Sequence, residues 1–291
     1  FAHLSYLRPH PPYAAAGEYS RRYDPDAVTP PVDAAETTHW LHSTAMENPA
    51  SAAPSTEEGR RQLRAQYYGM VTEVDAQLGR VLSALRASGA WDETLIVLTA
   101  DHGDQLGDHG LVEKLGYFEQ SYHIPLVVRD PSRIDAHAQR IQHFTENVDV
   151  LPTVLEVMGI EIPAQADGRS LRPFLEGRTP ASWRDGAHYE WDWRYLFLPF
   201  AKEHWPAERG LEQSNLAVLV DEEGAYVHFG DGSWLLFDLA ADPSWRTTCE
   251  EPNRVLAYAQ RMLSWRQEHL ERTYTDMLLN PMRPGRWPEL S

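Results

Sequence analysis

The chain has 291 residues, 42% of them hydrophobic and 24% charged, which is an ordinary composition for a globular protein with a large core. Forty-three acidic and 26 basic residues give a formal net charge of −17. This acidic balance argues against nucleic acid or a membrane surface as the main partner, because both attract basic proteins.

The first predicted element is a strand at residues 1–7, where polar and apolar residues alternate before the prolines of "RPHPPY" interrupt pairing. This stretch reads like the middle of a domain, so we expect an N-terminal portion to precede Phe1, and any signal sequence with it. Residues 13–55 are predicted to be a long irregular segment, a type that often has a functional role.

A long amphipathic helix is predicted over about 57–88. Ser55 and Glu58 have the spacing of a capping box, and apolar residues then recur at helical period until Gly89. The segment 94–100 follows as a strand that is apolar on both faces, which favours a place inside a parallel sheet.

A second apolar strand is predicted at 124–130, and a helix at 146–159. This order of helices and strands favours an α/β layered fold. Residues 215–243 read as an antiparallel meander, followed by an amphipathic helix at about 253–272 and a proline-broken extended tail.

The single cysteine, Cys249, cannot form an internal disulfide. A reducing compartment fits this usage, and we expect a bacterial cytoplasmic protein. The sequence has no run of about 18 apolar residues, the length needed to span a bilayer, so we expect no membrane partner.

Potential metal ligands follow the strand at 94–100. Asp101 and His102 come directly after "IVLTA", at the carboxyl end of a strand, where ligands bind in open α/β sheets. A carboxylate beside an imidazole suits Mn²⁺, Fe²⁺ or Zn²⁺ better than Ca²⁺. A capping aspartate beside a surface histidine is the alternative for an isolated pair. Gly103 favours the ligand interpretation, since it allows a sharp turn and a close approach.

Three further polar residues of this loop, Asp104, Asp108 and His109, could support the ligands from behind, although solvated loop residues are the interpretation that we favour for them. Lys114 could neutralise an anionic oxygen of a substrate, or it could be an ordinary surface lysine. His10 lies between two prolines that fix its backbone, as a positioned acid would require and as a rigid loop would also show.

The segments "DHGDQLGDHGLVEK", "RPHPP", "DVLPTVLEVMGI" and "LFDLAADP" resemble the C-terminal half of the sulfatase branch of the alkaline phosphatase superfamily. The Asp-His pair, where many sulfatases carry Asp-Asn, is most similar to the phosphonate monoester hydrolases and phosphodiesterases. The resemblance implies an α/β fold with a mixed, largely parallel sheet between helices, and a small C-terminal antiparallel sheet plus helix. It places residues 1–180 in the C-terminal part of the hydrolase core, and residues 181–291 in that antiparallel sheet, helix and tail.

The resemblance also implies roles for individual residues. Asp101 and His102 match two metal ligands, Lys114 the lysine that contacts the transferred group, and His10 the histidine that binds the substrate anion or assists the leaving group. The implied cofactors are a divalent transition metal (Mn, Fe or Zn) and a formylglycine nucleophile, made from a cysteine in a C-x-P-S-R or C-x-A-x-R context, which attacks phosphorus or sulfur.

We therefore expect a metal-dependent hydrolase of phosphonate monoesters or phosphate diesters, acting on a small anionic ester and able to form a homo-oligomer. An arylsulfatase-type sulfate ester hydrolase is the first alternative. Cys249, in "RTTCEEP", matches no maturation motif, and two protein ligands are too few to hold a catalytic metal tightly. We expect the nucleophile in a missing N-terminal portion and this chain to be inactive alone. A non-catalytic fragment or assembly module is the second alternative.

Overall fold

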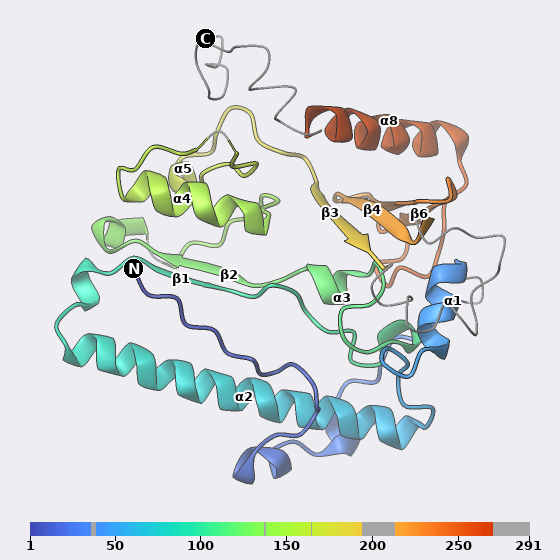
Figure 1. Cartoon of the computed structure of the whole chain (residues 1–291), viewed down its shortest axis with the longest axis horizontal. Coiled ribbons are helices and arrows are strands. Elements are labelled where there is room, and N and C mark those ends of the chain that lie inside the picture. Colours follow the sequence, from blue (N-terminus) through green and yellow to red (C-terminus); the bar gives the residue numbers. More distant parts are fainter. Residues whose placement is uncertain (36–38, 137, 164, 194–212, 270–291) are drawn as a thin grey trace. The chain divides into compact units, whose positions relative to one another are not determined.

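The computed structural model describes residues 1–35, 39–136, 138–163, 165–193 and 213–269 (Figure 1). The chain divides into two compact units, Phe1–Ser132 and Arg133–Ser291. This division does not test the domain boundary expected at residue 180, which stays a prediction, and the expected C-terminal tail lies outside the described residues. Within the described ranges no helix combines the length and the apolar character that crossing a bilayer requires.

The longest element of the first unit is α2, Glu57–Ala87, which confirms the predicted helix (Figure 1). Its N-cap is Thr56, whose hydroxyl accepts a hydrogen bond from the Gly59 amide at 3.1 Å, so the cap predicted at Ser55 is wrong by one residue. The side chains that α2 buries lie in its N-terminal half. They are Leu63, Arg64, Ala65 and Met70.

The N-terminal segment forms no strand over residues 1–7, contrary to expectation. Its large apolar side chains point into solvent, because no described strand pairs with it; they include Phe1, Leu4 and Leu7. The segment predicted to be irregular contains three short helices, of which the first two lie against α2. These are η1 (Gly17–Arg21), η2 (Pro25–Ala27) and α1 (Trp40–Glu47).

Two strands follow α2 and the single turn η3 (Trp91–Glu93). They are β1, Ile96–Thr99, and β2, Leu126–Arg129, and they pair antiparallel. A parallel neighbour was expected for 94–100, but β2 does not supply one. The chain between them contains only the single turns η4 (Asp108–Gly110) and α3 (Glu119–Tyr122), whereas a parallel pair needs a longer crossover, usually a helix.

The second unit contains a helical layer and a four-stranded sheet. The helix predicted at 146–159 is confirmed as η6 (Asn147–Asp149) continuing into α4 (Val150–Val157). Asp149 helps to fix its start, since its carboxylate accepts the Glu146 amide at 2.8 Å in a capping box. This buried carboxylate is also paired with Arg184 and accepts the Arg169 amide at 2.7 Å. The turn η5 (Pro131–Ala136) spans the boundary between the two units, and α5 (Arg172–Leu175) lies in the second.

The sheet has the order β3-β4-β5-β6 and is antiparallel throughout. Its strands are β3 (Ala187–Asp192), β4 (Asn215–Val220), β5 (Gly224–Phe229) and β6 (Trp234–Asp238). Helix α8, Pro252–Glu268, packs against β4 and β5. Their shared core contains Ala217, Leu219, Tyr226, Leu236, Tyr258 and Met262. The expected C-terminal antiparallel sheet with a helix is therefore confirmed.

Candidate functional site

Asp101 and His102 follow β1, and their side chains converge. Asp101 Oδ2 lies 3.6 Å from His102 Nε2, and the Asp101 side chain is 89% exposed. His102 Nδ1 lies 2.8 Å from the Gly103 carbonyl oxygen. Because a carbonyl oxygen only accepts, Nδ1 is the donor in this contact, and Nε2 is the ring nitrogen that faces Asp101. The carboxylate oxygen and the second ring nitrogen thus lie close to each other, with the Asp101 side chain open to solvent.

This pair has the chemistry of a transition-metal site but not the number of ligands. A carboxylate oxygen and an imidazole nitrogen held by a carbonyl behind it are a common donor combination for Mn²⁺, Fe²⁺ or Zn²⁺. Within the part of the chain that the structure describes, no three His, Cys, Asp or Glu side chains gather into a metal-binding group. Asp101 and His102 can therefore form part of a coordination sphere, and their metal role stays a prediction.

His10 and Lys114, the two predicted catalytic residues, lie on other segments. His10 is exposed, with Nδ1 3.0 Å from the Pro11 carbonyl oxygen. Lys114 is half-buried, and among the described residues its ammonium group has no acidic partner. Its carbonyl oxygen accepts a hydrogen bond from Tyr122 Oη at 3.2 Å. The polar ends of both side chains remain available to an anion, and their roles stay predictions.

Asp104 links the segments that carry His10, the pair Asp101 and His102, and Lys114. Tyr13 Oη donates to Asp104 Oδ2 at 2.8 Å, while Asp104 Oδ1 accepts the amides of Leu106 and Glu113 at 2.9 and 3.0 Å. The Glu113 amide also lies 3.1 Å from Tyr13 Oη. Burial raises the pKa of Asp104 against the effect of these hydrogen bonds, and burial together with the Asp104 charge raises the pKa of Tyr67 to about 12.

Asp108 and His109 are fully built into the fold. Asp108 is paired with Arg64 and accepts the Val32 amide at 2.7 Å. Burial raises the pKa of Asp108, although the charge of Arg64 opposes the shift. The buried ring of His109 stacks on Phe118, with ring centroids 3.6 Å apart. The expectation that Asp104, Asp108 and His109 are solvated loop residues is therefore wrong, because the loop folds back on itself and turns them inward.

Gly103 is required by the backbone around it. An added Cβ would lie 2.1 Å from the Gln120 carbonyl oxygen, and the Gly103 amide donates to the Ser121 carbonyl at 2.7 Å. The close approach predicted at this glycine thus occurs, but the chain itself makes it. The loop beyond it contains three non-glycine residues with positive φ, namely Leu106, His109 and Glu113.

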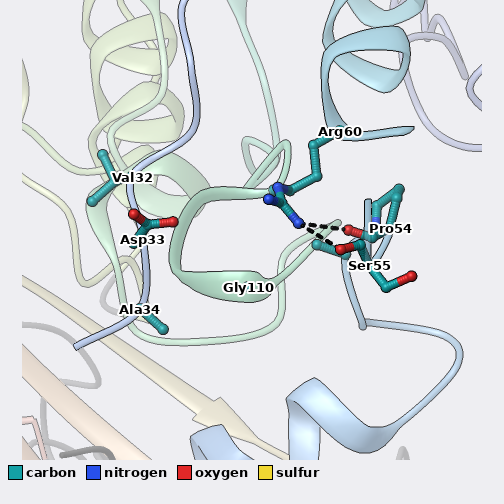
Figure 2. A pocket seen from close by; sticks show the side chains of 9 residues that line it. Val32, Asp33, Ala34, Pro54, Ser55, Arg60 and Gly110 are labelled. Carbon is teal, nitrogen blue, oxygen red and sulfur yellow. Dashed lines mark hydrogen bonds between the residues drawn. The ribbon is translucent and has the colours of Figure 1, made fainter. Parts of the chain in front are cut away.

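A pocket of about 180 Å³ lies in the same unit, but it is not the predicted site (Figure 2). Figure 2 shows the Arg60 side chain directed at the carbonyl oxygens of Pro54 and Ser55, to which Nη1 donates at 3.0 and 3.2 Å. The other residues that line it are Val32, Asp33, Ala34, Ala53, Gly107 and Gly110. None of His10, Asp101, His102 and Lys114 is among them, so we place the candidate site at the loop after β1.

Sequence reasoning missed Tyr13 and Arg64. Tyr13 closes the motif "RPHPPY", and its place three residues after His10 is the signal that could have drawn attention to it. Arg64 interrupts the apolar face of α2, and a charged residue at a core position of a helix indicates a buried partner.

Comparison with known proteins identifies the family. Residues 1–160, more than half of the chain, match the sulfatase family, and residues 107–270 match the C-terminal region of N-sulphoglucosamine sulphohydrolases. The multifunctional alkaline phosphatase superfamily protein PehA of Trinickia caryophylli is 39% identical over 97% of this chain and 58% of its own length. N-acetylglucosamine-6-O-sulfatase of Bacteroides thetaiotaomicron is 34% identical over 61% of this chain and 30% of its own length.

Among solved structures, the phosphonate monoester hydrolase of Agrobacterium radiobacter superposes with a TM-score of 0.85 at 37% identity. The match covers 95% of this chain and 58% of that protein, so the chain spans little more than half the length of such relatives. The α/β fold expected from the sequence is confirmed by this likeness. The chain belongs to the sulfatase family of the alkaline phosphatase superfamily.

Proposed function

We propose that this chain provides the metal-binding and anion-binding part of a hydrolase that cleaves phosphonate monoesters or phosphate diesters. The observation that carries the proposal is the closeness of Asp101 Oδ2 and His102 Nε2, 3.6 Å apart, with the Asp101 side chain exposed to solvent. Similarity to a phosphonate monoester hydrolase and to PehA over almost the whole chain favours phosphorus over sulfur. The sulfate ester alternative is supported by the similarity to an N-acetylglucosamine-6-O-sulfatase, which covers less of the chain.

Each proposed residue has a chemical task that suits its surroundings. Asp101 and His102 would hold a divalent transition metal, Mn, Fe or Zn, together with ligands from outside these 291 residues. Lys114, without an acidic partner among the described residues, would neutralise an anionic oxygen of the transferred group. The exposed His10 would bind the substrate anion or give a proton to the leaving oxygen.

The metal and a formylglycine would supply Lewis acidity and the nucleophile. The sequence carries no cysteine in a maturation context, so the proposed reaction needs its nucleophile from outside these residues. The proposal therefore concerns the whole protein as its gene encodes it.

The test is to replace Asp101 and His102 singly with alanine in that whole protein. Metal content after purification is expected to fall by at least about tenfold, and hydrolysis of bis(p-nitrophenyl) phosphate with it. Because the Asp101 side chain is 89% exposed, Asp101→Ala should leave the melting temperature of the metal-free protein unchanged. Asp75→Ala, on the exposed face of α2, is the matched control and should retain both metal and activity.

Retention of metal and diester hydrolysis by Asp101→Ala would refute the assignment. Faster cleavage of p-nitrophenyl sulfate than of the diester would favour the sulfatase alternative. A whole protein that binds metal but cleaves none of these esters would favour the non-catalytic alternative.

A further inference from the structure

Tyr13 lies where the three segments of the proposed site meet. These segments carry His10, the pair Asp101 and His102, and Lys114. Tyr13 Oη donates to Asp104, two residues beyond His102, and it accepts from the amide of Glu113, the residue before Lys114. One hydroxyl group therefore joins all three segments through hydrogen bonds of 2.8 and 3.1 Å.

The connection from Tyr13 to His10 is stiff. Only Pro11 and Pro12 separate the two residues, and a proline ring fixes the backbone φ angle near −65°. Beyond Tyr13, the chain is held against α2, since the Ala15 amide donates to Gln66 Oε1 at 3.1 Å. The position of the tyrosine ring therefore limits where His10 can lie.

The connection from Tyr13 to Lys114 passes through a strained residue. Glu113 has a φ of 58°, a left-handed conformation that disfavours a side chain with a Cβ. Its amide donates to Tyr13 and Asp104, and its carbonyl oxygen accepts the Gln105 amide at 2.8 Å. Such strain persists where surrounding contacts hold it, and it is characteristic of functional sites. The chain direction into Lys114 is thus set by these hydrogen bonds.

We propose that Tyr13, with Asp104 as its acceptor, is a positioning residue that fixes the spacing between His10 and Lys114 during ester hydrolysis. This inference rests on the proposed function. Tyr13 acts through His10 and has no role in chemistry of its own. A purely structural tyrosine would instead affect folding and leave the contribution of His10 unchanged.

The experiment is a double-mutant cycle of Tyr13→Phe and His10→Ala in the whole protein. Phenylalanine retains the ring, including its contact with Tyr67 at a centroid distance of 6.4 Å, and removes only the hydroxyl. The matched control is Tyr23→Phe. Tyr23 lies on the same N-terminal segment as Tyr13, and its hydroxyl is hydrogen-bonded to Thr72 Oγ1 of α2 at 2.8 Å.

The measured quantities are kcat and KM for bis(p-nitrophenyl) phosphate and for a diester with a poorer leaving group. Tyr13→Phe is expected to lower kcat by between about 10-fold and about 100-fold, more for the poorer leaving group, with metal content unchanged. In the His10→Ala background the same change should have less than about a twofold effect, since the two residues act as one unit. Tyr23→Phe should match the wild type in both backgrounds.

Hydrogen exchange provides a second readout that does not depend on catalysis. Tyr13→Phe should speed amide exchange in residues 103–106 and 113–116, and Tyr23→Phe should not. Additive effects of Tyr13→Phe and His10→Ala, or unchanged exchange in both segments, would overturn the inference while leaving the proposed function intact. A wild-type protein that cleaves no ester would instead overturn the proposed function, and this inference with it.

Discussion

Replacing Arg64 with methionine tests how the loop after β1 is held on α2. Arg64 and Asp108 are an ion pair whose side chains are only 7% and 11% exposed. Arg64 Nε also donates to the Leu106 carbonyl oxygen at 3.0 Å. Methionine keeps most of the length of the side chain but leaves a buried carboxylate without its counter-charge. Removal of one partner from such a pair costs about 3–5 kcal/mol, and we expect Arg64→Met to lower the free energy of unfolding by that amount.

The cost of this truncation is not the net value of the pair. Burial raises the pKa of Asp108 although Arg64 and the Val32 amide both favour the charged form, so the pair does not fully repay the desolvation of the carboxylate. Asp108→Asn should therefore restore about 1–3 kcal/mol in the Arg64→Met background. The asparagine oxygen can still accept the Val32 amide, and no unpaired charge remains.

The assay is urea denaturation of the whole protein at pH 7, with Arg61→Met as control. Arg61 lies on the same helix and pairs with Glu57, but both side chains are solvent-accessible, so its loss should scarcely change stability. The Arg64→Met deficit should also shrink as the pH falls through the pKa of Asp108, because the fold tolerates the protonated acid better. A loss no larger than that of Arg61→Met, or a further loss on adding Asp108→Asn, would refute this reasoning.

Two other predictions concern a titrating group and two glycines. Burial opposes the ionised form of Asp221, but hydrogen bonds from Tyr258 and other donors outweigh it and lower the pKa of Asp221 below its ordinary value of 3.8. Asp221→Asn should therefore destabilise the protein at neutral pH, where the carboxylate is ionised. The difference from wild type should vanish as the pH falls through that lowered pKa, which an acid titration followed by fluorescence would show; a pH-independent difference would contradict it. Gly103→Ala should lower the free energy of unfolding by about 1–3 kcal/mol in thermal melts, because its Cβ would lie 2.1 Å from the Gln120 carbonyl oxygen. Gly79→Ala, in open space on α2, should instead stabilise by about 0.8–1.0 kcal/mol, and equal effects at the two glycines would contradict both expectations.

Local periodicity was sufficient to predict the elements that bury one face. Helices α2 and α8 and the meander β4 to β6 lie where the apolar pattern placed them. The strand predicted at residues 1–7 failed because alternation alone does not supply a partner strand, and backbone pairing decides whether a strand forms. The parallel neighbour expected for residues 94–100 is not supplied by β2, since apolar runs do not encode the direction of pairing.

The contacts around the candidate site could be predicted only between residues that are neighbours in sequence. Asp101 and His102 are adjacent, and a strand end followed by glycine was enough to suggest that they converge. Tyr13 bonds to a residue 91 positions away, and Arg64 to one 44 positions away. Such long-range hydrogen bonds arise from tertiary packing, and no local pattern of residue types predicts their partners.

Exposure divides the polar residues of the loop into two groups with different tasks. Asp104 and Asp108 each accept two or more hydrogen bonds from the chain, and the ring of His109 is stacked and buried. Burying these two carboxylates costs desolvation energy, and this is why the pKa of each is raised. Asp101 differs, because its side chain is 89% exposed and lies 3.6 Å from His102 Nε2. A loop that satisfies its other acids internally and presents this one pair outward has the arrangement expected of a ligand site on a rigid support.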